Sequence, residues 1–267
     1  MRDHYYEEVV RSWSHDQRRL FPPERFRYRE ETGSTNTDLL QYLRSGAGEP
    51  FDLVVADFQT AGRGRRGDRW EAPSGRNLLF SLALPLTGDR ETWGRLPHLA
   101  AWAVGSAIES VLTSGERIAT KWPNDILHRG RKLGGILVET VMEPAPFAVV
   151  GVGLNVNVRP HEYPDSIREL AVSLYELQEC ESSRWFLLGL VLEKFLHSYP
   201  DKLTKFEMVH DWLEERSFLK GKKLRIETSA GPLVGTARRM NANGELLLED
   251  EEGTVHVIRS AERILFC

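Results

Sequence analysis

The chain has 267 residues, enough for one large domain with a small appendage. Its hydrophobic content of 41% and charged content of 28% are ordinary for a globular protein, and its formal net charge of −4 excludes a global electrostatic footprint for nucleic acid. The two cysteines, Cys180 and Cys267, lie far apart, which excludes a disulfide framework and metal-ligand spacing and fits a reducing cytosol.

The N-terminal region, MRDHYYEEVVRSWSHDQRR, is charged throughout. It lacks the apolar stretch of a signal peptide, and no apolar run in the chain approaches the ~20 residues that span a bilayer. We therefore expect a cytoplasmic protein. Residues 4–15 are predicted as a short helix that ends at FPPERF, because proline removes a backbone donor and clashes with the preceding turn.

Apolar periodicity predicts alternating strands and helices through the middle of the chain. A turn, a polar cap and an amphipathic helix follow one another in TGSTNTDLLQYLRSG, with Leu39, Leu40 and Leu43 on one face and Gly46 at the end. The stretch IATKWPNDILHRGRKLGGILVETVM predicts a strand, a Pro-Asn turn, a strand, a basic hairpin and a further strand. Other strands are expected at residues 25–31, 52–60, 77–86 and 147–158, and other helices at 96–115, 183–203 and 206–217.

The chain changes character from about Leu219. Short alternating strands are joined there by Ala-Gly-Pro, Asn-Gly and Glu-Gly turns. This pattern predicts a small all-β, barrel-like module of roughly fifty residues, near the size at which a domain can fold alone. The predicted fold class is α+β, with a large mixed sheet backed by helices and then a small β-barrel.

The segment QTAGRGRRGDRW, residues 59–70, places arginines among glycines. Its glycines satisfy the dinucleotide pattern G-x-G-x-x-G, but Pro73, Gly75 and another strand follow Gly67 where a helix should open. The Walker pattern fails too, since no Lys-Ser or Lys-Thr follows. A nucleic-acid loop could use the arginines on phosphates and Trp70 on a base, but the acidic net charge opposes it. Alone, the stretch is most typical of a solvated surface loop.

Three further motifs change this interpretation: STN at 34–36, KWPND and RKLGGILVE within 121–139, and GVGLNVN at 151–157. Together with Q-x-x-G-R-G-R-R-G-x-x-W at residues 59–70, they resemble the biotin–protein ligase family, the biotin–acetyl-CoA-carboxylase ligases. The resemblance runs from about Tyr28 to the end of the chain. Each motif alone would be weak, but together, in order and correctly spaced, they are highly specific.

The resemblance implies a domain organisation. Residues 1–27 form an N-terminal extension of open role, 28–217 a catalytic domain like that of biotin and lipoate ligases, and 218–267 an SH3-like barrel, since GTARRMNANGELLLEDEEG looks like the family's C-terminal module. Some members carry an N-terminal winged helix-turn-helix and also repress biotin synthesis. The short stretch before STN has no room for such a DNA-binding domain, so we expect a ligase without repressor function.

The family's reaction has two halves. Biotin's carboxylate attacks the α-phosphate of ATP, supplied with Mg²⁺, to give biotinyl-5′-AMP and pyrophosphate. A lysine ε-amine on a biotin-carboxyl-carrier-type domain then attacks this mixed anhydride. Because the first half brings two anions together, it needs preorganised cations and oriented donors at the reacting phosphate. Glycines let backbone N–H groups close on the ligand.

By motif, Lys132 resembles the family's catalytic lysine at the carboxylate–phosphate junction, and Arg63 and Arg65 resemble the residues that hold the carboxylate and then the acyl-phosphate. A single hairpin lysine is usually only solvated, so its flanking motif decides here. The implied catalytic residues are Lys132 and Arg65. The implied biotin-binding residues are Ser34, Thr35, Asn36, Gln59, Arg63, Gly64, Arg65, Lys132, Gly151 and Leu154, with Gly153 beside them.

The implied ATP and adenylate residues are Arg66, Trp70, Asn124 and Asn155, and Asp125 is a candidate for Mg²⁺. Several of these types have ordinary alternatives. Residues 34–36 also fit a helix N-cap, Asn124 fits turn chemistry after Pro123, and Trp70 fits a core position. A capping turn can still present its other oxygens to a ligand, so both functions can hold there.

The arginine loop is expected to order over the acyl-adenylate and shield the anhydride from water. Asp68 lies where many relatives are basic and could weaken the loop's hold on the adenylate. Lipoate–protein ligases and octanoyltransferases share the fold, but the arginine loop and KWPND…RKLGG favour biotin. A non-enzymatic nucleic-acid module would instead show salt-dependent binding. The acceptor's identity, the choice of monomer or homodimer and the role of the C-terminal barrel stay open, and no DNA or membrane partner is expected.

Overall fold

The computed structural model describes residues 2–113 and 115–267. Its centre is a seven-stranded sheet with the order β1-β2-β3-β7-β6-β5-β4. β1 and β2 run parallel, as the crossover helix between them requires, and the other neighbouring pairs are antiparallel. The strands are β1 (Phe26–Thr32), β2 (Leu53–Gln59), β3 (Leu78–Pro85), β4 (Ala119–Lys121), β5 (Asp125–His128), β6 (Arg131–Val141) and β7 (Phe147–Leu154).

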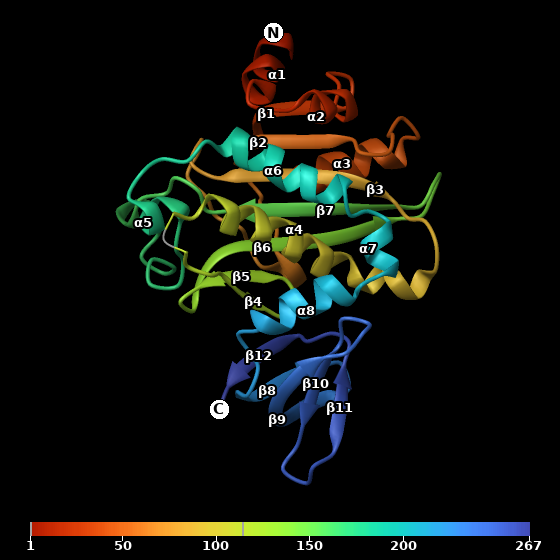
Figure 1. The fold of residues 1–267 in the computed structure, drawn as a ribbon, viewed down its shortest axis with the longest axis vertical. Coiled ribbons are helices and arrows are strands. Elements are labelled where there is room, and N and C mark those ends of the chain that lie inside the picture. Colours follow the sequence, from red (N-terminus) through yellow and green to blue (C-terminus); the bar gives the residue numbers. More distant parts are fainter. Residues whose placement is uncertain (1, 114) are drawn as a thin grey trace.

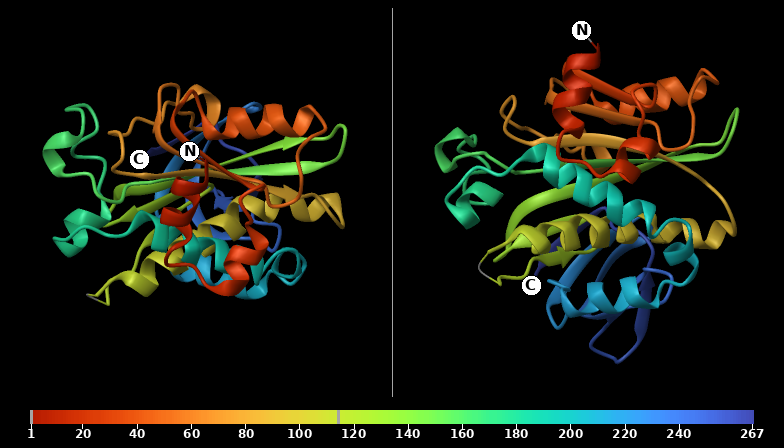
Figure 2. Two further views of the ribbon diagram at one scale, coloured as in Figure 1. Left: turned by 90° about the horizontal axis from the view of Figure 1, so that it is seen from above. Right: turned by 45° about the horizontal axis from the view of Figure 1, so that its top comes forward.

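Helices cover both faces of this sheet (Figure 2). On one face, three buried leucines of α3 pack against Val54 and Val149 of the sheet. On the other face, α1, α2, α4 and α6 enclose the larger core, which the fully buried Phe80 and Leu82 enter from β3. The helices are α1 (Arg2–Val10), α2 (His15–Leu20), α3 (Thr35–Arg44), α4 (Leu96–Val111), α5 (Leu174–Gln178), α6 (Arg184–Leu196), α7 (Asp201–Thr204) and α8 (Glu207–Glu215).

A second sheet of five antiparallel strands lies beyond β4, at the opposite end of the molecule from the N-terminal helices (Figure 1). Its order is β11-β10-β9-β8-β12. The strands are β8 (Lys223–Thr228), β9 (Gly231–Met240), β10 (Leu246–Glu249), β11 (Val255–Ile258) and β12 (Arg263–Phe266). The predicted Asn-Gly and Glu-Gly turns are formed at Gly244 (φ 81°) and Gly253 (φ 84°). The predicted fold class, a large mixed sheet backed by helices and then a small β appendage, is confirmed.

The N-terminal segment differs from its prediction. Instead of one helix at residues 4–15, the chain forms two, because Ser14 starts α2 with a capping box to Gln17. Gln17 also reaches α6, where its Nε2 donates to Gly189 O at 2.7 Å. The N-terminal helices are therefore part of the main core.

Two other boundaries also fall earlier than expected. The strand predicted over 147–158 ends at Leu154, and the helix predicted over 96–115 ends at Val111. Just past the end of the strand, Asn155 is buried and its side-chain Nδ2 donates to Lys132 O at 3.2 Å and to Val172 O at 3.1 Å. None of the described helices is long and apolar enough to cross a membrane.

Candidate active site

A pocket of about 270 Å³ opens on the sheet face that carries α3, at the ends of β6 and β7. Segments from almost the whole chain meet there, including the C-terminal sheet. Its lining comes from residues 34–36, 59, 63–66, 68–70, 121–125, 132, 135–137, 151–153 and 261–264. The sheet places these segments together because cross-strand neighbours share a face: Gly151 pairs with Ser81 of β3 and Leu137 of β6.

One wall of the pocket is a hydrogen-bond network of uncharged side chains at the start of α3, which meets a charged group where Asn36 Nδ2 donates to Glu139 Oε2 at 2.9 Å. The backbone N–H of Thr35 donates to Gln59 Oε1 at 2.8 Å, and the Thr35 hydroxyl donates to the same oxygen at 3.1 Å. The hydroxyl of Ser81, which is fully buried in β3, lies 2.7 Å from Thr35 Oγ1 and 2.6 Å from Asn36 Oδ1. These contacts fix the orientation of the polar groups before any ligand arrives.

Ser34 occupies the N-cap position of α3, but its side chain makes no capping hydrogen bond. The helix-cap alternative therefore does not account for this hydroxyl, which is buried and lines the pocket.

Glycines in β6 and β7 let large groups lie directly on the sheet. A Cβ on Gly151 would lie 2.1 Å from Asn36 Oδ1, and a Cβ on Gly153 would lie 2.5 Å from Trp70 Cε2. The same indole covers Gly135, whose Cβ would be 3.2 Å from Trp70 Cζ3. The close approach expected at these glycines is thus made by the protein's own Asn36 and Trp70.

The arginine loop (residues 59–70) folds back on itself as a small hairpin. Arg63 and Arg69 form a bridge, Gly64 N–H donates to Asp68 O at 2.7 Å, and Trp70 N–H donates to Gly62 O at 3.0 Å. This closure turns Trp70 back over the sheet while the arginines line the pocket.

The arginines of the loop are held partly by carboxylates from other segments. Arg63 donates to both oxygens of Glu139, at 3.1 and 2.7 Å, and Arg66 lies 3.6 Å from Glu262 of the C-terminal segment. Arg65 is the most enclosed of them: burial, with Arg66 beside it, lowers the pKa of its guanidinium. A cation that is poorly solvated in this way acts strongly on an anion brought next to it.

Lys132 projects from β6 into the same pocket. Its Nζ lies 2.8 Å from Asp125 Oδ1 and 5.7 Å from the centre of the Trp70 ring. Asp125 is the first residue of β5 and follows the turn from β4, where Asn124 N–H donates to Lys121 O at 3.2 Å, as turn chemistry requires. The Asn124 side chain also donates, from Nδ2 to Ile136 O at 2.9 Å, so its Oδ1 is available to a ligand.

The C-terminal sheet contributes to this site. Residues 261–264 line the pocket, and the carbonyl of Gly244 accepts hydrogen bonds from Trp122 Nε1 at 2.9 Å and His98 Nε2 at 2.8 Å. Burial lowers the pKa of His98 to about 4, so the ring is neutral near pH 7 and carries its proton on Nε2. The sequence left the role of this module open, and the structure places it against the turn that carries Asn124.

Two predicted site residues lie outside the pocket lining. Leu154 alternates with Gly153 along β7, so its side chain is on the opposite face of the sheet, fully buried beneath the helices. Asn155 is buried past the end of β7, and its Nδ2 donates to Lys132 O and Val172 O. Asn155 supports the backbone behind Lys132, so neither Leu154 nor Asn155 is part of the pocket lining.

The other predicted residues do meet in the pocket: Ser34, Thr35, Asn36, Gln59, Arg63, Gly64, Arg65, Arg66, Trp70, Asn124, Asp125, Lys132 and Gly151. Sequence reasoning missed Ser81, Glu139 and residues 261–264. Ser81 could have been noticed as the one polar residue in the apolar run FSLAL, and Glu139 as the acidic residue that ends the motif RKLGGILVE. Nothing local marked residues 261–264, because only the packing of the second sheet brings them here.

No cluster of three or more His, Cys, Asp or Glu side chains that could hold a metal ion occurs among the described residues. Asp125 and the free Oδ1 of Asn124 are the oxygen donors of the turn in the pocket. Two oxygen donors suit Mg²⁺, which usually keeps several waters and is held largely by substrate phosphates.

Comparison with known proteins gives the family. Residues 28–157 match the biotin/lipoate A/B protein ligase family. The chain is 34% identical to the biotin–[acetyl-CoA-carboxylase] ligase of Mycobacterium tuberculosis over 85% of this chain and 84% of the relative, and 34% identical to the bifunctional ligase/repressor BirA of Bacillus subtilis over 85% and 70%. The Aquifex aeolicus biotin protein ligase, solved in complex with biotin and ATP, superimposes with a TM-score of 0.78 and 26% identity, covering 91% of this chain and 99% of that one. The chain is an enzyme of the biotin protein ligase family.

Proposed function

We propose that this enzyme activates biotin with ATP to biotinyl-5′-AMP and transfers biotin to a specific lysine of a carboxylase carrier domain. One observation carries the proposal: a neutral hydrogen-bonding wall and a set of cations, Arg63, Arg65 and Lys132, line a single pocket. The first suits an uncharged ring, and the second suits the carboxylate and phosphate that must react. The names of the relatives from M. tuberculosis and A. aeolicus support these substrates.

The biotin ring would lie against the start of α3. The ureido group carries N–H donors and a carbonyl acceptor, and Ser34, Thr35, Asn36 and Gln59 offer matching short groups. Gly151 lets Asn36 lie directly on the sheet at this place, since even a methyl group there would meet the Asn36 side chain. The carboxylate end would then point toward Arg63 and the other cations.

In the first half-reaction, the carboxylate oxygen attacks the α-phosphorus and the bond to the pyrophosphate leaving group breaks. Lys132 and Arg65 stabilise the negative charge that gathers on the phosphorus oxygens. In the second half, a lysine amine attacks the acyl carbon, loses its proton, and AMP leaves with the bonding pair. Lys132 stays non-covalent throughout, because its role is to supply fixed positive charge between carboxylate and phosphate.

Arg66, Trp70 and Asn124 would contact the ATP and adenylate. Asp125 and Asn124 Oδ1 would hold Mg²⁺, which when bound neutralises phosphate charge. Asp125 pairs with Lys132 at 2.8 Å, so ligand binding would redistribute this contact between metal and lysine. The arginine loop would close further over the adenylate and exclude water from the anhydride. Asp68 lies beside Arg65 in this loop and partly offsets its charge.

The test of this proposal is transfer to protein. An isolated biotin carboxyl carrier domain is incubated with the enzyme, biotin, ATP and Mg²⁺, and the acceptor is weighed by mass spectrometry. We expect a mass increase equal to one biotin less one water, absent when the acceptor lysine is replaced by arginine. No mass increase, or an increase that persists in the arginine variant, would reject the transfer.

We also propose that the ligase acts in the cytoplasm, where ATP and carrier domains occur together, and does not bind DNA specifically. The formal net charge of −4 supports the second point. Binding to random and operator-like duplexes at increasing salt is its test, and a specific complex that survives 200 mM salt, the upper end of a ~50–200 mM series, would contradict it.

A further inference from the structure

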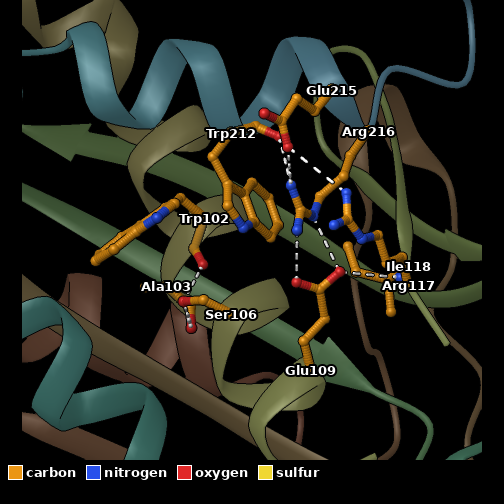
Figure 3. Close-up of polar contacts among 9 residues, drawn as sticks. All are labelled: Trp102, Ala103, Ser106, Glu109, Arg117, Ile118, Trp212, Glu215 and Arg216. Atoms are coloured by element: carbon orange, nitrogen blue, oxygen red, sulfur yellow. Dashed lines mark hydrogen bonds and ion pairs between the residues drawn. The ribbon is translucent and has the colours of Figure 1, made fainter. Parts of the chain in front are cut away.

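A buried ion pair lies behind the pocket, on the face of the sheet away from the arginine loop. Glu109 of α4 accepts two hydrogen bonds from Arg216, one from Nε and one from Nη2, each at 2.9 Å. Figure 3 shows the two side chains facing each other. The Arg216 side chain is 9% exposed and the Glu109 side chain 18%. A bidentate pair of this kind fixes the direction of the guanidinium as well as its distance.

The contacts around this pair complete its geometry. The Arg216 guanidinium lies 4.3 Å from the centre of the Trp212 ring, and its Nη1 donates to Trp212 O at 3.2 Å. Glu109 Oε1 also accepts from Ile118 N–H at 3.2 Å. Gly105 of α4 makes room for Trp212, since a Cβ there would lie 2.4 Å from the indole. Helix α4, α8 and the strand that follows Ile118 therefore meet at one carboxylate.

The backbone on either side of Arg216 pairs with the strand that leads into the pocket. Thr120 N–H donates to Arg216 O, and Phe218 N–H donates to Thr120 O, both at 2.8 Å, so residues 216–218 extend the main sheet beyond β4. Lys121, the next residue after Thr120, begins the turn 121–125 that lines the pocket. The same segment 216–218 leads on to the C-terminal sheet.

We propose that Glu109 and Arg216 are positioning residues for the ATP side of the active site. By holding 216–218 beside β4 they fix the turn 121–125 and the start of the C-terminal sheet relative to each other. Neither residue lines the pocket. The inference rests on the proposed function, in which Asn124 and Asp125 of this turn serve ATP.

The chain offers a matched pair of variants. Glu109 and Glu215 both bind the Arg216 guanidinium, but Glu215 is 63% exposed and meets only Nη1, at 3.2 Å. Exposed pairs contribute little, whereas a buried cation that loses its partner is costly. Glu109→Gln should therefore disturb the turn and Glu215→Gln should not. Arg216→Lys is a further variant, which keeps the charge but loses the planar fork.

Two readouts are needed. Hydrogen exchange measured by mass spectrometry should be faster across residues 118–123 in Glu109→Gln and unchanged across 151–154. In biotin-dependent pyrophosphate exchange, the KM for ATP should rise about tenfold while the KM for biotin stays within about twofold, because the biotin wall is built on α3 and β3. Arg216→Lys should raise the KM for ATP in the same way while leaving the KM for biotin nearly unchanged. Glu215→Gln should change neither the hydrogen exchange nor the KM for ATP.

Unchanged hydrogen exchange across 118–123 in Glu109→Gln would overturn the inference. Faster hydrogen exchange there with an unchanged KM for ATP would overturn it as well. Equal rises in both KM values, or a loss of active enzyme with neither KM altered, would show a general structural role instead and would also overturn it. Failure of the proposed function would look different: the wild-type protein itself would then show no biotin-dependent exchange of pyrophosphate into ATP.

Discussion

The wall beneath α3 and the charged side of the pocket are ordered by different interactions. Thr35, Asn36 and Ser81 on the wall are 4%, 3% and 0% exposed, uncharged, and joined by hydrogen bonds. On the charged side, the side chains of Arg63 and Lys132 are each 41% exposed and paired with Glu139 and with Asp125, respectively.

From this difference we infer that the wall selects biotin and that the charged side serves catalysis. A buried neutral network is costly to disturb, because any unpaired polar group there stays away from water. Exposed ion pairs contribute about 0–1 kcal/mol, so Arg63 and Lys132 can exchange their carboxylate partners for a substrate anion at small cost. We expect changes on the wall to act on biotin affinity and changes on the charged side to act on the rate.

Loss of Lys132 should have the largest effect. Lys132→Ala should lower kcat for pyrophosphate exchange by on the order of 10²–10³, because it removes the cation at the carboxylate–phosphate junction. Lys220→Ala is the control, since Lys220 is exposed and pairs with Glu214, outside the pocket. A loss smaller than about threefold, the size of a ~0.7 kcal/mol effect, would mean that this charge is not at the reacting centre.

The packing of the C-terminal sheet against α4, where His98 meets Gly244, can be tested through pH. In the unfolded chain His98 takes up a proton near pH 6.5, but in the folded protein only near pH 4, so stability falls as the pH falls through this window. The loss attributable to this residue should reach about 3 kcal/mol by pH 4. Urea unfolding of wild type and His98→Gln at pH 7 and pH 4 measures the difference, and equal losses in both proteins would contradict the assignment.

On the wall, Gly151→Ala should weaken biotin binding about 10- to 100-fold, because the new methyl group would displace Asn36 at a cost of about 1–3 kcal/mol. Gly94→Ala is a matched control, since a Cβ there meets nothing within 4 Å. Isothermal titration with biotin gives both affinities. An unchanged affinity in Gly151→Ala would place the biotin ring elsewhere.

Ser81→Ala should have a smaller effect on the same wall. Removing this hydroxyl takes away the hydrogen-bond partner of Thr35 Oγ1 and Asn36 Oδ1. Biotin binding should weaken about threefold to tenfold, with kcat nearly unchanged. Ser106→Ala removes a hydroxyl that bonds only carbonyls of its own helix, at Trp102 and Ala103, and should change neither value. A fall in kcat as large as the loss of affinity in Ser81→Ala would blur the proposed separation of the two sides.

Local pattern predicted most strands and the α3 amphipathic face, because alternation is a local property, whereas the residues that converge on the pocket were implied by the resemblance to the ligase family. Alternation already indicated that the Leu154 side chain does not line the pocket: if Gly153 faces the pocket, the next residue of a strand faces away. The inward orientation of the Asn155 side chain could not be predicted, since it depends on tertiary contacts such as the one with Val172 O. The contribution of residues 261–264 depends on how two sheets pack, which no local pattern contains.

The most direct test of the whole account is exchange of labelled pyrophosphate into ATP by the wild-type enzyme, measured with biotin, lipoate and octanoate in parallel. Exchange with biotin and not with the other two acids is the predicted result, because the short donors and acceptors beneath α3 match a ureido ring and not an alkyl chain. Exchange driven only by lipoate or octanoate, or no exchange with any of the three acids, would contradict the proposed biotin activation.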